Sequence, residues 1–243
     1  MADRWKCARC LALDLGIVLA ALLASANVFG QSKNLAPGFD SLPRNARIVL
    51  MPVDIELFSR SAGGVPEPRA DWTDAANKHF KAALLAKKDS LGATSVEWTA
   101  KEDEAVDEIN ALHAAIAEAI QFHHFGDSSF NLPTKDGKLD WSMGEAVAPI
   151  REKTGADYAL FTWLRDYYAS GERIATIIFM ALLTGGRTVM SGGVQVGYAS
   201  LVDLKTGQVL WFNRLARLSG DLREPAKAAE TLEALLENFP RTP

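Results

Sequence analysis

The fold is decided by residues 193–218, which read GVQVGYASLVDLKTGQVLWFNRLARL. Two stretches, Gly193–Leu204 and Gln208–Leu218, are rich in the β-branched and aromatic residues typical of strands. Three residues join them, and a three-residue connection that ends in glycine is a common hairpin turn with a left-handed last residue. The sequence therefore predicts an antiparallel hairpin in which Gly207 makes the turn and Trp211 packs into the core.

Three stretches nearer the N-terminus predict further strands. Ala46–Ile55 (ARIVLMPVDI) is a short, mostly apolar run, as expected of a strand that is covered on both faces. Ala93–Trp98 predicts a short strand, and Asp157–Tyr167 (DYALFTWLRDY) predicts a longer one.

Helical periodicity separates these strands. A helix is expected over Trp72–Ser90, with Asp71 as its N-cap residue. Two Ser/Thr-x-x-Glu capping signatures, at Thr99–Glu102 and Ser142–Glu145, predict two more helices that end near Phe125 and Gly155, and an amphipathic helix is expected over Arg223–Asn238. This order of elements predicts an α/β (α+β) fold, with a mixed β-sheet flanked by helices, a C-terminal β-hairpin and a terminal helix.

The N-terminus has the layout of a secretory signal peptide over residues 1–26. Three basic residues precede an apolar core of about ten residues, and the small residues Ala24, Ser25 and Ala26 follow it. An uncleaved anchor or a buried helix is the alternative interpretation. Residues 27–45 are polar and predict a flexible tether, which leaves 46–243 as a single α/β envelope domain. The only other plausible domain boundary lies between residues 126 and 140.

Charge and cysteine content narrow the class of protein. The chain carries a formal net charge of −4 with both signs interspersed, so nucleic acid is not an expected partner. Both cysteines, Cys7 and Cys10, lie in the predicted signal peptide. Their spacing resembles a redox or zinc half-site, but this position argues against that role. An exported chain of this kind relies on its hydrophobic core and not on disulfides.

No residue pattern points to a catalytic, cofactor or metal site. The histidines His113, His123 and His124 share one expected helix, but they lack the three- or four-residue spacing of zinc ligands on one helix face. We therefore expect them to be solvated or at the edge of the core. The glycines of 185–193 lack the endings of a phosphate-binding or dinucleotide-binding loop and predict a connector.

The most unusual segment is Ile174–Leu183 (IATIIFMALL), in which only Thr176 is polar. One interpretation is a buried strand or a short core helix. The other is an apolar flap between glycines that meets a membrane or a partner through six side chains: Ile174, Ile177, Ile178, Phe179, Leu182 and Leu183. A second surface of interest is the aromatic strand that contains Tyr158, Phe161, Trp163, Tyr167 and Tyr168.

Two segments together resemble a known pattern of envelope proteins. They are GADYALF (155–161) and ASLVDLKTGQVLW (199–211). They are similar to the curli secretion-channel lipoproteins, to the lipoprotein activators of penicillin-binding proteins and to the N-terminal domain of the Tol translocation protein. The resemblance implies an α/β fold with a mixed sheet and a role in envelope assembly or secretion. The first two groups are lipidated on a cysteine after the signal core, and residues 24–31 contain none, so we expect an exported, periplasmic chain that is not lipidated there.

The function expected from the sequence is that of a non-enzymatic binding or accessory domain in the periplasm. Its partner would be another envelope protein, with peripheral membrane contact as a further expectation and with no cofactor or metal. The alternative is a periplasmic hydrolase whose site is built from dispersed carboxylates and histidines. Whether the chain is an enzyme, and its oligomeric state, are not fixed by the sequence.

Overall fold

The computed structural model describes residues 32–91, 94–98, 104–185, 193–218 and 220–242. Residues 33–243 belong to one compact unit. The predicted signal peptide, the first residues of the predicted tether and the Thr99–Glu102 capping signature lie outside the described residues.

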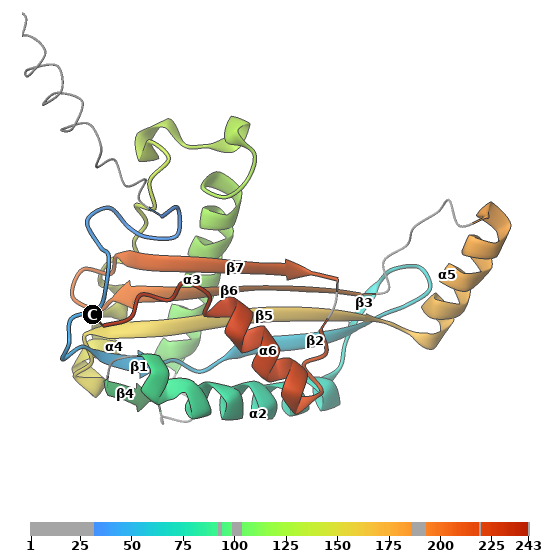
Figure 1. Ribbon diagram of the computed structural model, residues 1–243, viewed down its shortest axis with the longest axis horizontal. Helices are drawn as coiled ribbons and strands as arrows, with labels where there is room; N and C mark the ends of the chain where they lie inside the picture. The colour runs from blue at the N-terminus through green and yellow to red at the C-terminus, as the bar shows by residue number, and fades with distance from the viewer. Residues whose placement is uncertain (1–31, 92–93, 99–103, 186–192, 219, 243) are drawn as a thin grey trace, which may run out of the picture. The chain divides into compact units, whose positions relative to one another are not determined.

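The described strands form one mixed sheet, which confirms the predicted fold class (Figure 1). The strands are β1 (Arg47–Leu50), β2 (Asp54–Arg60), β3 (Pro66–Pro68), β4 (Thr94–Glu97), β5 (Tyr158–Ala169), β6 (Gly193–Asp203) and β7 (Val209–Arg217). Strand β5 is central: β6 lies antiparallel to it on one side, and both β1 and β2 lie parallel to it on the other.

The predicted strand over Ala46–Ile55 is two strands and not one. Strands β1 and β2 follow each other along β5, and the chain leaves the ladder at Met51–Val53 between them. Pro52 explains the break, since proline has no backbone N–H to donate to a neighbouring strand. In the next position outward, β4 pairs with β1 and β3 pairs with β2.

Helices cover both faces of this sheet. The α-helices of the described chain are α2 (Ala70–Lys87), α3 (Glu104–His123), α4 (Ala148–Thr154), α5 (Gly171–Thr184) and α6 (Pro225–Leu235). Single 3₁₀ turns are η1 (Lys88–Leu91), η2 (Ser128–Phe130), η3 (Pro133–Lys135) and η4 (Gly144–Val147). Asp71 lies in the first turn of α2 and not at its N-cap position, which Arg69 occupies. Ser142 accepts a hydrogen bond from the backbone N–H of Gly144, so the predicted box with Glu145 is not formed as expected.

Alternating side chains divide the core between the two faces. Helices α2 and α6 pack on one face through Phe80, Leu84 and Leu232, and helix α3 packs on the other through Ile109 and Ile120. Strand residues supply both cores in turn, as the twofold period of a strand requires: Ile48 and Leu50 face α2, and Val49 and Met51 face α3.

The predicted C-terminal hairpin and terminal helix are both present. Strands β6 and β7 pair antiparallel, and Gly207 has a φ of +73° between them. Two hydrogen bonds within the turn stabilise it, because the side chain of Asp203 accepts from the backbone N–H groups of Lys205 and Thr206. A third hydrogen bond connects the turn to a distant segment, since the Gly207 carbonyl accepts from Met143 N–H.

Replacing Gly207 with alanine is expected to lower the free energy of unfolding by about 2–3 kcal/mol. Two costs combine, since the left-handed backbone disfavours a side chain and the new Cβ would lie 2.1 Å from the Gly144 carbonyl oxygen. Gly137 is a matched control, with a φ of +67° and open space around its Cβ position, so Gly137→Ala is expected to cost about 1 kcal/mol. Urea unfolding of both variants measures the difference, and equal losses would contradict the steric part of this prediction.

The described part of the predicted tether differs from a free linker. Ala36 and Leu42 are buried, and Leu35 forms a β-bridge with Trp211. The backbone N–H of Ala36 donates to the Leu210 carbonyl at 2.8 Å. Residues 34–36 therefore pair with β7, and Leu42 packs in the core that also contains residues of α2 and α6.

Candidate functional site at the α5 end of the sheet

The apolar segment singled out from the sequence is an exposed helix. It forms α5, and its large apolar side chains face solvent, with exposed fractions of 49% at Ile174, 56% at Ile178, 60% at Phe179, 78% at Leu182 and 66% at Leu183. Ile177 on the other side is half-buried. The interpretation of this segment as a buried strand or core helix is therefore wrong, because these side chains lie outside both cores of the sheet.

Local chemistry explains why this run becomes a helix. Ser170 is the N-cap residue, and its hydroxyl accepts a hydrogen bond from the Arg173 N–H. Glu172 in the first turn complements the helix dipole. Gly185 closes the other end with a φ of +61°, as expected of a C-cap glycine.

Helix α5 extends from the end of the sheet where β5 ends and β6 begins (Figure 1). The β5–β6 ladder continues to the pair Tyr168 and Gly193, so α5 belongs to an insertion between two paired strand ends. The start of the helix is tied to β2, because Ser170 N–H donates to the Arg60 carbonyl at 2.9 Å.

A buried polar network fixes the strands below α5. Asp166 on β5 lies directly opposite Gln195 on β6, and Gln195 Nε2 donates to Asp166 Oδ2 at 2.7 Å. The Tyr168 hydroxyl donates to the same oxygen at 2.6 Å. Gln195 Oε1 in turn accepts from Arg217 Nε on β7 and from the Thr231 hydroxyl on α6. One set of hydrogen bonds thus joins four elements at the base of α5.

The electrostatics of this network follow from burial. Asp166 is 2% exposed, and burial raises the pKa of its carboxyl although Tyr168 and Gln195 donate hydrogen bonds to it. Burial and the nearby Asp166 carboxylate also raise the pKa of Tyr168. A cavity of about 270 Å³ opens beside Asp166, with Ile174 of α5 and Leu218 in its walls. The network links β5, β6, β7 and α6 at the end of the sheet from which α5 extends.

The aromatic strand does not form one surface. Phe161 is buried in the core under α3, and Trp163 stacks on Tyr198 of β6. Tyr167 stacks on Phe58 at a ring-centroid distance of 4.9 Å, and Tyr168 belongs to the polar network. Because neighbouring residues of a strand point to opposite faces, these rings are divided between the two sides of the sheet.

The histidines are structural. His113 is 3% exposed and stacks on Phe161, and its Nε2 lies 2.8 Å from the hydroxyl of Ser200. It is therefore a core residue and not a solvated one. His124 is also buried and bonds to the Lys33 carbonyl, and His123 bonds to the Phe130 carbonyl.

These positions bear on the hydrolase alternative. A serine and a histidine at hydrogen-bonding distance resemble a nucleophile and its base. Here both side chains are enclosed in the core, with 1% exposure for Ser200, so the pair packs the sheet against α3. Within the described ranges, no three His, Cys, Asp or Glu side chains gather in a way that could hold a metal ion. Most of the glycine-rich connector, residues 186–192, lies outside the described residues.

No family model matches the chain, and no curated protein matches it. Solved structures with some likeness include the PelC dodecamer from Paraburkholderia phytofirmans, with 11% identity, a TM-score of 0.36, and coverage of 84% of this chain and 94% of that one. Lipoprotein GNA1162 from Neisseria meningitidis has 13% identity, a TM-score of 0.32 and coverages of 79% and 94%. The LpoB C-terminal domain from Escherichia coli has 13% identity, a TM-score of 0.29 and coverages of 75% and 89%.

At these TM-scores and identities the likeness carries no argument about function. The functional proposal therefore depends on this chain's own residues.

Sequence reasoning missed the polar network under α5. Asp166, Gln195, Arg217 and Thr231 come from four different elements and become neighbours only in the folded sheet. The sequence did contain one signal, which is Asp166 itself. It is a charged residue within the mostly apolar strand Asp157–Tyr167, and a buried charge needs hydrogen-bond partners.

Proposed function

We propose that this chain is a non-enzymatic accessory domain of the cell envelope, acting in envelope assembly or secretion, and that α5 attaches it to the surface of a lipid bilayer. The layout of residues 1–26 supports export. The observation that carries the attachment is α5 itself, in which the segment Ile174–Leu183 has one polar residue and exposes five large apolar side chains.

The distribution of residues around α5 favours lipid over a protein groove. Helices that bind in a protein groove are amphipathic, with a polar face left to solvent. From Ile174 to Leu183 the helix has no charged residue, and Thr176 is its only polar residue. A helix that is apolar all round is normally buried in a core or in a membrane.

The polar groups of α5 are compatible with an apolar environment. The Thr176 hydroxyl donates to the Glu172 carbonyl, and the Thr184 hydroxyl donates to the Met180 carbonyl. Gly185 N–H donates to the Ala181 carbonyl and so satisfies another group of the last turn. Lipid offers no hydrogen bonds, so groups that are satisfied within the helix lower the cost of contact with it.

The length of α5 sets the depth of that contact. The ten residues of Ile174–Leu183 rise about 15 Å, which is half of the roughly 30 Å hydrocarbon core. In the part of the chain that the structure describes, no helix is long and apolar enough to cross a membrane. The five exposed side chains would contribute about 6 kcal/mol on burial, which is sufficient for reversible binding to one leaflet.

Replacing Ile178 and Phe179 with aspartate is expected to reduce liposome binding at least tenfold, since it removes about 3 kcal/mol of apolar burial and adds two charges. The measurement is flotation of residues 33–243 with vesicles of phosphatidylethanolamine and phosphatidylglycerol. This unit carries both cores of the sheet and excludes the apolar N-terminal segment, which would itself bind lipid.

A matched control is Phe122→Asp with Phe130→Asp. These side chains are 50% and 48% exposed, contact each other through tilted rings on elements other than α5, and give the same change in charge. The control is expected to float like the parent chain, and circular dichroism checks that each protein is folded. If the parent chain stays at the bottom of the gradient, or if both double variants lose binding equally, α5 does not bind lipid and a protein partner takes its place.

A further inference from the structure

The break between β1 and β2 leaves a cavity at the edge of the sheet. Strand β4 pairs with β1 only as far as Glu97, and β3 pairs with β2 only at Phe58–Arg60. Between them, no described strand pairs with Met51–Val53 on the outer side. Helix α2 crosses this gap, and a cavity of about 490 Å³ lies between the helix and the break.

The cavity has the size and the lining of a small-molecule site. Sites for small ligands are typically a few hundred Å³ in volume and mainly apolar, with a few polar groups that orient the ligand. Leu50, Pro52 and Val53 line it from the strand break, and Leu84 and Leu85 line it from α2. The site also lies beyond the carboxyl ends of the parallel strands β1 and β4, where α/β sheets commonly bind ligands.

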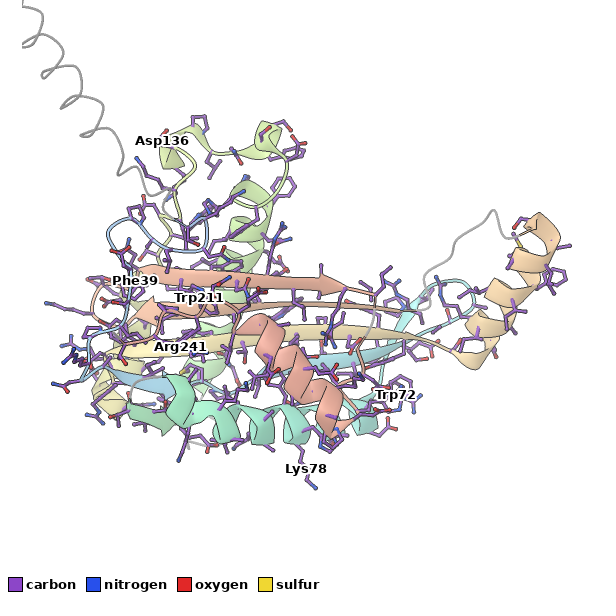
Figure 2. All side chains as sticks on the ribbon, in the orientation of Figure 1. Phe39, Trp72, Lys78, Asp136, Trp211 and Arg241 are labelled. Carbon is purple, nitrogen blue, oxygen red and sulfur yellow. The ribbon has the colours of Figure 1, made fainter. Side chains whose placement is uncertain are left out.

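The polar groups of the cavity leave one positive charge. Lys81 of α2 forms an ion pair with Glu97 of β4, so these two charges compensate each other. Lys78, one turn earlier on α2, is also among the residues that line the cavity, and it has no ion pair or hydrogen bond among the described residues. Its side chain extends from α2 away from the sheet (Figure 2). The cavity is therefore lined mainly by apolar residues, and its charged lining residues sum to one positive charge.

We propose that this cavity binds a single-chain amphiphile with an anionic headgroup. The hydrocarbon chain would occupy the apolar space between α2 and the strand break, where its burial is favourable. The headgroup would stay at the mouth near Lys78, in contact with water. This site is distinct from α5, which lies at the other end of β2.

Isothermal titration calorimetry of residues 33–243 with dodecanoate, below its micelle concentration, tests the proposal. We expect saturable binding to one site and weaker binding of dodecyltrimethylammonium, which has the opposite charge. Leu85→Trp fills the cavity from a partly exposed helix position and is expected to weaken dodecanoate binding about tenfold or more. Lys78→Glu leaves the cavity open and is expected to weaken it about fivefold while improving binding of the cationic amphiphile.

The α5 double variant, Ile178→Asp with Phe179→Asp, separates this site from the proposed membrane helix. It is expected to bind dodecanoate as the parent chain does. Binding that is lost in the α5 variant and kept in Leu85→Trp would overturn the proposal, as would an absence of saturable heat with the parent chain. Val53→Phe is a second filling variant that keeps the test valid if Leu85→Trp fails to fold.

Discussion

Replacing Trp211 with alanine is expected to lower the free energy of unfolding by about 4 kcal/mol. The side chain is fully buried in the core under α2 and α6, and its ring meets Phe239 edge-on at 5.1 Å between centroids. Its backbone also forms the bridge to Leu35, so one residue joins β7, the C-terminal segment and residues 33–45. Alanine keeps the backbone bridge, so the loss comes from the cavity and from the missing side-chain contacts, including the contact with Phe239.

Urea unfolding of residues 33–243 measures this loss. Trp163→Ala is the matched control, because Trp163 lies on the same sheet but is partly exposed. Its ring stacks on Tyr198 at the surface of the sheet. We expect it to cost about 1 kcal/mol, mostly from its ring contact with Tyr198. A loss below about 1.5 kcal/mol for Trp211→Ala would contradict the placement of Trp211 at the centre of this core.

The unfolding free energy is expected to fall as the pH is lowered from 7 to 4, and His113 is the main cause. Burial lowers the pKa of His113 from 6.5 to about 3, because the protonated ring is disfavoured beside Phe161. The unfolded chain therefore binds a proton between pH 6.5 and pH 3 that the folded chain does not bind. The contribution of neutral His113 to the free energy of unfolding is complete above pH 6.5. It falls by up to about 5 kcal/mol as the pH is lowered to 3.

The measurement compares the pH dependence of urea unfolding for the parent chain and His113→Gln. Glutamine keeps a hydrogen bond to Ser200 within reach but has no titration in this range. The variant is expected to show a much flatter profile between pH 7 and pH 4, whatever its stability at pH 7. Parallel profiles for the two proteins would mean that His113 is not buried as a neutral ring.

Features set by local chemistry were predictable from the sequence. The hairpin follows from a glycine-ended turn between two β-rich stretches, and its partner strands meet without any long-range information. The burial of His113 was also predictable, because it lies at helical spacing from the apolar residues Val106, Ile109, Ala117 and Ile120. All four of these are buried.

Features set by tertiary context were not predictable. A run of ten residues with a single polar one is compatible with a strand or a helix, buried or exposed, and only its position beyond the β5–β6 ladder makes α5 an exposed helix. The Asp166 network and the cavity at Met51–Val53 each depend on strands that are far apart in the chain. Pro52 is a sequence signal for the strand break. The gap at the edge of the sheet, however, can be recognised only once the order of the strands is known.

Site-specific fluorescence quenching tests most directly whether α5 enters the hydrocarbon region of a bilayer. Residues 33–243 contain no cysteine, so Leu182→Cys and Asp136→Cys each give a single labelling site, on α5 and on an exposed turn after η3. With vesicles that contain lipids brominated on their acyl chains, we predict strong quenching of a polarity-sensitive dye at position 182 and none at position 136. Unquenched fluorescence at position 182, with the same emission maximum as in buffer, would contradict the account.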